Sequence, residues 1–398
     1  MPRIMVFVVF AVAHFLSNFV RMANAVIADD LTLEFGMGPA ELGWMTSLFF
    51  LAFAAAQLPF GWALDRFGAR VVTPSLMLVA VAGALVFAAG QSIGALTVGR
   101  ALMGLGTAGI LMGGLKALST WFDARRFALI SGALVALGSS GGLMAATPLA
   151  WLSTTFGWRI VFVFGAGALA AAAALLLAFG RAGPSHAADT SDANDSGGFG
   201  VIFRTPAFWR MAGMAVATTG VVFAFQSLWA GPYLTQGVGL ATLPTGNVLL
   251  AFGIGASLGY LLLGAMGERI GVARMILFAA LAFIAVEIVL AFTPLPGGGR
   301  LAASFLMLGA AGSASGLVYS LARSTFPLAL TGRAVTAINL FLFAGGFALQ
   351  WGLGVWLDAG LGGFGSLFAL TATLGVAAVL VFLPDALGAS RRLLNRPA

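Results

Sequence analysis

Residues 61 to 70 read GWALDRFGAR and carry an acid and two arginines in a chain of which only 8% is charged. The apolar run 42–60 comes directly before this stretch, and another apolar run begins at Val71. A helix of about 20 mainly apolar residues is long enough to cross the hydrocarbon core of a membrane. The stretch therefore predicts a short charged turn between two membrane-spanning helices.

The composition limits the class of protein. The chain has 398 residues, 60% of them hydrophobic, and a mean hydropathy of +1.03, so most of its surface must face lipid rather than water. The absence of cysteine excludes thiolate metal sites and cysteine nucleophiles, and the two histidines, His14 and His186, form no metal pattern. The sequence also lacks the G-K-[ST] of a nucleotide loop. We expect no enzymatic activity and no catalytic residue, metal or cofactor.

Apolar stretches long enough to span a membrane occur twelve times in the sequence. Their approximate limits are 4–28, 42–63, 71–91, 95–118, 127–150, 158–180, 209–232, 245–266, 273–293, 300–322, 334–357 and 363–383. They fall six and six around residues 181–208, whose Asp, Ser and Gly are typical of a flexible linker. We predict an all-α membrane protein with two pseudo-symmetric six-helix bundles, 1–180 and 209–398.

The basic residues predict the orientation of these spans. Fourteen of the twenty lie on the side of the termini: Arg3, Arg66, Arg70, Arg125, Arg126, Arg181, Arg204, Arg210, Arg269, Arg274, Arg333, Arg391, Arg392 and Arg396. Only Arg159 and Arg300 fall in the opposite loops. Lys and Arg gather in cytoplasmic loops, so the termini and the linker are predicted to be cytoplasmic in a bacterial inner membrane. The net charge of +7 comes as short clusters between spans, which favours membrane topology over a nucleic-acid partner.

The charged turn recurs in weaker form in the second half. Residues 264–274 read GAMGERIGVAR, with Glu268 and Arg269 at the spacing of Asp65 and Arg66. Two homologous halves of six spans are typical of secondary transporters, whose substrate site lies between the halves near the middle of the membrane.

Two motifs connect the chain to a known family. Gly61, Asp65, Arg66, Gly68 and Arg70 match the loop signature G-x-x-x-D-R-x-G-x-R, and Leu96, Arg100, Gly104 and Gly106 match a second pattern in span 4. On these residues the chain resembles the major facilitator superfamily over essentially its whole length. The resemblance implies transport of a small molecule by alternating access, a central cavity lined by spans 1, 4, 7 and 10, and a latch role for the loop. We predict that Arg100, Glu268 and Arg269 take part in the conformational switch together with the loop. We expect a monomer in the lipid bilayer.

The loop motif also has a direct physical interpretation. A short connection between two spans needs glycines for close approach and for left-handed turns. Asp65 at the N-terminus of a helix in the other bundle would contribute roughly 0.3–1 kcal/mol, enough to bias a conformational equilibrium. Arg66 and Arg70 are predicted to find carboxylates or lipid phosphates. The alternative is a solvated loop that serves only as a topology signal.

Polar residues on the spans predict a substrate site. Residues predicted to share a helical face are His14, Ser17, Asn18, Arg21 and Asn24 on span 1, Thr219, Phe223, Gln226 and Tyr233 on span 7, Gly312, Gly316, Tyr319 and Arg323 on span 10, and Asn339, Phe343 and Gln350 on span 11. From these faces we predict substrate contacts at His14, Asn18, Arg21, Gln226, Tyr319 and Arg323.

The charges inside the spans suggest the kind of substrate. An arginine in hydrocarbon needs a partner, a water-filled cavity or a nearby interface. Arg21 is predicted to anchor an organic anion, and the alternative is that it pairs with Asp29 or Asp30. Glu287 is the only carboxylate clearly within a span, and it serves either in a buried hydrogen bond or in proton coupling. The rival functions are a proton-coupled multidrug exporter and a sensor or assembly subunit that does not transport.

The predicted topology can be tested with reporter fusions. A fusion within residues 181–208 is expected to report the cytoplasm, because the excess of basic residues is on that side. A periplasmic signal from the same fusion would contradict the even number of spans in the first half.

Overall fold

Helices make up nearly all of the regular structure in the computed structural model, which describes residues 2–122, 124–179, 198–294 and 298–388. In this part of the chain, 11 helical segments are long and apolar enough to cross a membrane, and the bent pair formed by α7 and α8 brings the number to 12. The predicted all-helical membrane protein is therefore confirmed.

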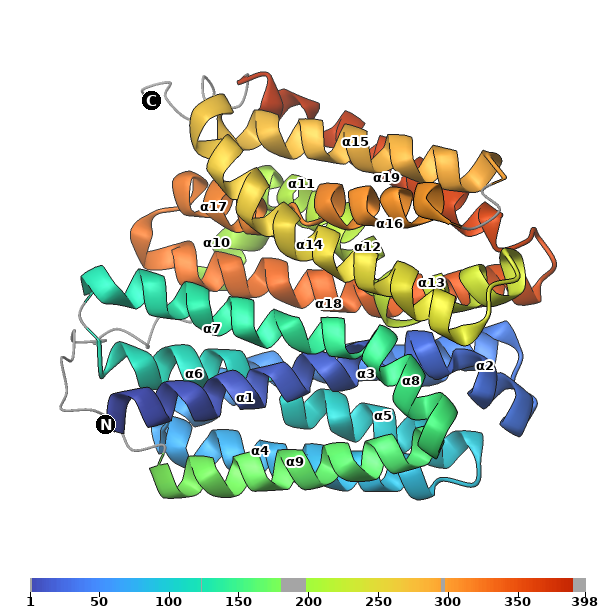
Figure 1. Ribbon diagram of the computed structural model, residues 1–398. Helices are drawn as coiled ribbons and strands as arrows, with labels where there is room; N and C mark the ends of the chain where they lie inside the picture. The colour runs from blue at the N-terminus through green and yellow to red at the C-terminus, as the bar shows by residue number, and fades with distance from the viewer. Residues whose placement is uncertain (1, 123, 180–197, 295–297, 389–398) are drawn as a thin grey trace.

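The helices of the first half fill the lower part of Figure 1. They are α1 (Pro2–Met22), α2 (Asn24–Phe35), α3 (Pro39–Phe67), α4 (Ala69–Ala89), α5 (Ile93–Thr107), α6 (Ile110–Ser119), α7 (Ala124–Met144), α8 (Thr147–Phe156) and α9 (Trp158–Phe179). Spans 1, 4 and 5 are each divided into two helices. We call the end of the molecule where α1 begins and α19 ends, on the left of Figure 1, the terminal end, and the other the opposite end.

The second half lies above the first in Figure 1. It begins with α10 (Gly198–Arg204) and a seventh span composed of α11 (Pro206–Ala215), η1 (Val216–Gly220), α12 (Val221–Ala224), η2 (Phe225–Trp229), α13 (Ala230–Pro232) and η3 (Tyr233–Gly237), in which the η segments are π-helical. The remaining helices are α14 (Thr242–Ile270), α15 (Val272–Phe292), α16 (Gly299–Gly312), α17 (Ser315–Thr325), α18 (Leu328–Asp358) and α19 (Gly365–Ala386).

The predicted linker includes a helix. Residues 180–197 lie outside the described part of the chain, but α10 falls within the predicted range 181–208. The ring of Phe203 in α10 packs edge-on against Phe208 and Phe341, with centroids 5.4 and 6.2 Å away. The last turns before span 7 are therefore packed against the second half. The domain boundaries at 180 and 209 stay a prediction.

Glycine supports the charged turn in both halves. Gly68 separates α3 from α4 with φ +77°, and Gly271 separates α14 from α15 with φ +99°. Side chains of L-residues are strained at such angles, so the predicted requirement for glycine in these turns is confirmed. Gly61 differs, because nothing lies within 4 Å of the position that its Cβ would take. The close approach expected at Gly61 is absent among the described residues.

The two halves repeat one helix contact. A Cβ at Gly104 of α5 would overlap the carbonyl oxygen of Phe49 in α3. In the same way, a Cβ at Gly309 of α16 would overlap the carbonyl oxygen of Phe252 in α14. Small residues allow helix backbones to approach closely inside a membrane, where no hydrophobic force drives them together. Spans 2 and 4 of the first half therefore pack as spans 8 and 10 do in the second.

The halves meet closely at the opposite end. Gly231 of α13 lies against α2, and a Cβ there would overlap the carbonyl oxygen of Ala25. Two side-chain hydrogen bonds join described residues of the two halves, from Gln236 Nε2 to Asp29 Oδ1 at 2.7 Å and from Thr147 Oγ1 to Asn247 Oδ1 at 2.9 Å. Both bonds lie toward this end, so the structure represents a state in which the opposite end is packed.

Substituting Gly231→Ala should shift the protein away from this state, because the added methyl group cannot occupy the same space as the Ala25 carbonyl. The chain has no cysteine, so a Thr147→Cys and Asn247→Cys pair can report closure by disulfide cross-linking without background. We expect cross-linking to fall in the Gly231→Ala variant.

Gly132→Ala on α7 is the matched control, because nothing lies within 4 Å of the place where its added methyl group would sit. This variant should cross-link as well as the parent pair. Equal cross-linking in Gly231→Ala and Gly132→Ala would mean that the helices move apart locally and that Gly231 does not limit closure.

Candidate functional site

A break in span 1 organises the centre of the first half. The helix α1 ends at Met22 and α2 begins at Asn24, which leaves the last carbonyls of α1 without helical partners. Arg100 of α5 is fully buried and donates from Nη1 to the Val20 carbonyl at 2.9 Å and from Nη2 to the Arg21 carbonyl at 3.4 Å. Arg100, which the sequence placed in the conformational switch, therefore caps α1.

Span 10 has a similar break in the second half. The helix α16 ends at Gly312 and α17 begins at Ser315. The hydroxyl of Thr219 on span 7 donates to the Gly312 carbonyl at 2.9 Å and accepts the backbone N–H of Ser315 at 3.2 Å. Discontinuous helices of this kind are typical of substrate and ion sites in transporters. The two breaks indicate where a site can form.

Three residues of the predicted polar face of span 1 are brought together, whereas Asn24 donates to a threonine of α3 at 3.0 Å. The side-chain amide of Asn18 donates to the His14 carbonyl at 2.9 Å, and Arg21 Nη2 donates to Asn18 Oδ1. The ring of His14 packs so closely on Gly138 of α7 that a Cβ there would overlap it. Arg21 Nε is buried and has no hydrogen-bond partner among the described residues.

Arg21 faces the second half of the protein. Its guanidinium carbon is 5.1 Å from the ring centroid of Phe223 and 5.9 Å from that of Phe343. The alternative ion pair is not formed among the described residues, because Asp29 accepts its hydrogen bond from Gln236, while Asp30 accepts one from Ser153 at 3.2 Å.

The second half contributes polar groups to the same region. The Tyr319 hydroxyl donates to Asn339 Oδ1 at 3.0 Å, which joins spans 10 and 11. Gln226 is partly exposed and lies beside Gly253 of α14. Arg323 is exposed in the last turn of α17 and makes no hydrogen bond or ion pair with another described residue. Its role in the site stays a prediction.

Sequence reasoning missed Tyr260 on span 8. This residue is 40% exposed, and its hydroxyl lies 3.4 Å from Ser315 Oγ at the start of α17. The chain has only three tyrosines, so their scarcity is the signal that could have identified it.

The predicted helical face of span 7 is wrong at Tyr233, the last residue assigned to it. Tyr233 donates to the Leu290 carbonyl at 3.3 Å and packs against Phe305 and Phe368, inside the second half. The cause is the π-helical geometry of η1 and η2, which changes the number of residues per turn and rotates later side chains off a face with a period of 3.6.

The arginines of the loop motif contact a backbone carbonyl and two aromatic rings. Arg70 Nε donates to the Leu177 carbonyl in the last turn of α9 at 3.1 Å, and the Arg66 guanidinium lies over Trp62 and Phe67 at 5.5 and 5.6 Å. Carboxylate or lipid-phosphate partners for Arg66 and Arg70 stay a prediction. The side chain of Asp65 lies outside the described part of the chain.

The charged residues in the second copy of the loop motif make fewer contacts than those in the first. Glu268 and Arg269 are exposed, and neither makes a hydrogen bond or ion pair with any residue in the described ranges.

Glu287 is fully buried on α15 and faces α19, where its carboxylate would lie 4.0 Å from a Cβ added at Gly375. It therefore lies on the supporting side of the second half.

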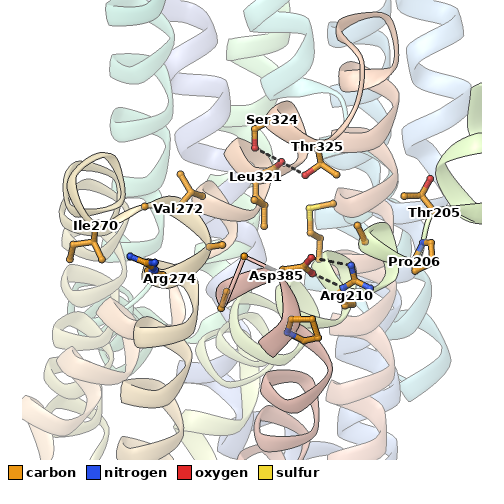
Figure 2. Close-up of a pocket in the computed structure, with 17 residues that line it drawn as sticks. Thr205, Pro206, Arg210, Ile270, Val272, Arg274, Leu321, Ser324, Thr325 and Asp385 are labelled. Carbon is orange, nitrogen blue, oxygen red and sulfur yellow. Dashed lines mark hydrogen bonds and ion pairs between the residues drawn. The ribbon is translucent and has the colours of Figure 1, made fainter. Parts of the chain in front are cut away.

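A separate cavity of about 650 Å³ opens within the second half at the terminal end (Figure 2). It is lined by the first turns of α11 and α15 and by the last turns of α17 and α19. Arg210 and Asp385 form a paired contact on its wall, with Nε to Oδ2 at 2.5 Å and Nη2 to Oδ1 at 3.0 Å. This ion pair fastens α11 to α19.

Comparison with known proteins supports the fold and the general activity. A sequence model of the Major Facilitator Superfamily matches residues 10–350. Among solved structures, a bacterial homolog of the human lysosomal transporter Spinster, inward-facing and unoccupied, has a TM-score of 0.76 at 18% identity and covers 100% of this chain and 99% of that chain. That likeness shows the fold alone.

Curated relatives match part of the chain. The probable galactarate/D-glucarate transporter GudP of Bacillus subtilis (strain 168) is 28% identical over 149 residues, which cover 36% of this chain and 33% of that protein. The probable sulfoacetate transporter SauU of Cupriavidus necator is 29% identical over 178 residues, which cover 44% of this chain and 41% of that protein. The matched region is less than half the length of each relative.

Substituting Arg100→Lys should destabilise the fold, because an ammonium group cannot make the forked contact with two carbonyls or stack on Phe49, whose ring centroid is 4.9 Å from the guanidinium carbon. We expect a loss of about 1–3 kcal/mol in unfolding free energy, measured by denaturation in detergent. The exposed Arg274→Lys is the control. Equal stability of the two variants would show that water or another group replaces the cap.

Proposed function

Since the chain belongs to the Major Facilitator Superfamily, we propose that this secondary transporter carries a small organic anion. As a member of that family it is a multi-pass membrane transporter and not an enzyme. The proposal further places it in a bacterial inner membrane as a monomer, with both termini and the 181–208 linker in the cytoplasm. The six-helix bundles 1–180 and 209–398 would then be the two bodies that move.

The buried Nε of Arg21 carries the proposal. This N–H group has no partner among the described residues, although a polar group that is buried without a hydrogen bond costs about 1–3 kcal/mol. An arginine inside a membrane costs at least about 2.5 kcal/mol on insertion scales. A carboxylate or phosphate oxygen would satisfy this donor through a charge-assisted hydrogen bond and would offset both costs.

The neighbouring residues support an anion site. Asn18 holds the guanidinium through Nη2, and His14 lies one turn earlier on the same helix. From the other half we propose that Gln226 and Tyr319 close the site, with Arg323 attracting the anion at the terminal end. The relatives named for galactarate, D-glucarate and sulfoacetate agree with an anionic substrate.

Alternating access requires the packed opposite end to separate. We propose that the loop motif at the terminal end, Gly61, Asp65, Arg66, Gly68 and Arg70, takes part in this change as a latch, together with Glu268 and Arg269 in the second half. Arg70 already fastens the start of α4 to the end of α9, which would make the first half move as a unit. A proton is the candidate coupling ion, with His14 as a carrier within reach of Arg21.

Removing the proposed anchor should abolish transport of anions. In proteoliposomes, Arg21→Ala should eliminate uptake of the carboxylate substrate, while Arg21→Lys should weaken its binding roughly tenfold to a hundredfold, because the charge remains but the planar fork is lost. Binding of candidate carboxylates to purified protein gives the affinity directly, and uptake with and without a pH gradient tests for the coupled proton.

Arg300→Ala is the matched control for these variants, because Arg300 is exposed in the first turn of α16 at the opposite end. It should bind and transport as the parent protein does. The anion proposal fails if Arg21→Ala retains unchanged affinity for every carboxylate, or if only neutral and cationic compounds are transported.

A further inference from the structure

We infer that the anion bound at Arg21 is an aromatic carboxylate or a carboxylate with a similarly flat apolar body. The inference rests on the proposed function and adds a substrate class to it. It comes from the phenyl rings that surround Arg21, because the guanidinium lies over Phe223 of span 7 and Phe343 of span 11. The polar face of span 1 therefore meets an aromatic surface across the interface between the halves.

The aromatic surface extends over three spans. The rings of Phe50 and Phe223 are parallel within 8° with centroids 6.0 Å apart, and the rings of Phe53 and Phe343 stack at 4.1 Å. Phe223 and Phe343 are themselves 5.5 Å apart. We call these four residues the phenylalanine cluster. It joins α3 of the first half to spans 7 and 11 of the second.

The guanidinium of Arg21 leaves a defined direction for binding. The Phe223 and Phe343 centroids are 5.1 and 5.9 Å from the guanidinium carbon and 5.5 Å from each other, so both rings lie on the same side of Arg21. The N–H groups of a guanidinium point outward along the edge of its plane, where a planar carboxylate can accept them. The partnerless Nε of Arg21 lies on that edge. A flat body attached to the carboxylate would then lie against Phe223, the partly exposed ring of the phenylalanine cluster, as aromatic rings favour stacked or edge-on neighbours.

Apart from Gln226, which has no hydrogen-bond partner among the described residues, the polar groups nearby are already engaged with one another. The Asn18 amide donates to the His14 carbonyl, and its oxygen accepts from Arg21. The Tyr319 hydroxyl donates to Asn339, while that of Tyr260 lies at hydrogen-bonding distance from Ser315. A substrate with several hydroxyl groups would need to break these bonds or leave its own hydroxyls unpaired. The site thus discriminates against polyhydroxylated acids.

Two aromatic side chains keep exposed area that an occupant could contact. Phe223 is partly exposed, and Tyr260 is 40% exposed although it lies in the interior of a 29-residue helix. Phe343 is buried beneath Arg21 and the rest of the phenylalanine cluster. Phe223 is therefore the member of the phenylalanine cluster whose ring should decide selectivity.

The inference predicts a ranking of ligands and a selective loss. Benzoate should bind the purified protein more tightly than cyclohexanecarboxylate, acetate or galactarate in calorimetry. Phe223→Leu keeps an apolar side chain but removes the ring face, so it should weaken benzoate binding about threefold to tenfold and leave acetate binding unchanged. Phe164→Leu, at a lipid-exposed position on α9, is the control and should bind all four acids as the parent does.

The outcomes separate this inference from the anion proposal. Galactarate binding as tightly as benzoate, or an unchanged ratio of benzoate to acetate affinity in Phe223→Leu, would overturn the aromatic preference while the anion site stands. Arg21→Ala should abolish binding of benzoate and acetate alike. If Arg21→Ala binds both acids normally, the anion site itself is wrong and the selectivity inference falls with it.

Discussion

The backbone carbonyls at the break of span 1 impose the constraint on which the site depends. Water is unavailable inside a bilayer, so a helix interrupted there must find other donors for its last carbonyls. Arg100 supplies them, and the burial of its charge is offset by two carbonyl oxygens and the face of Phe49. One of those carbonyls belongs to Arg21. The residue proposed to hold the substrate is thus fixed through its own backbone, and its side chain is left free to face the other half.

Close glycine contacts occur in two settings with different consequences. Gly104 against Phe49 lies within one half and repeats as Gly309 against Phe252, so it gives each half a rigid unit. Gly231 lies between the halves, where the same closeness must be lost whenever the opposite end opens. Contacts of this kind consist of many weak van der Waals interactions, and few hydrogen bonds between described residues cross the interface between the halves. An interface of this kind can separate in steps that each cost little free energy.

The sequence predicts features that follow from local chemistry. Long apolar runs predict the spans, positive φ requires glycine at Gly68 and Gly271, and the spacing of His14, Asn18 and Arg21 brings them onto one face of a regular α-helix. Features set by tertiary contacts are missed. The π-helical segments η1 and η2 of span 7 move Tyr233 off its expected face, and Arg70 finds a backbone carbonyl, which no pattern of side chains encodes. Tyr260 stands alone in span 8, so periodicity gave no reason to choose it.

A substrate drives alternating access only if its affinity differs between the states, because equal affinity shifts no equilibrium. The site meets this requirement because its residues come from both halves. Arg21 belongs to the first half, whereas Phe223 and Phe343 belong to the second, so their distances of 5.1 and 5.9 Å depend on how the halves are packed. An anion held by the edge of Arg21 with its body against Phe223 contacts both halves at once. The bound anion neutralises the charge of Arg21, which now lies against the rings. Opening the opposite end would change the contacts of the anion with Arg21 and with Phe223 together.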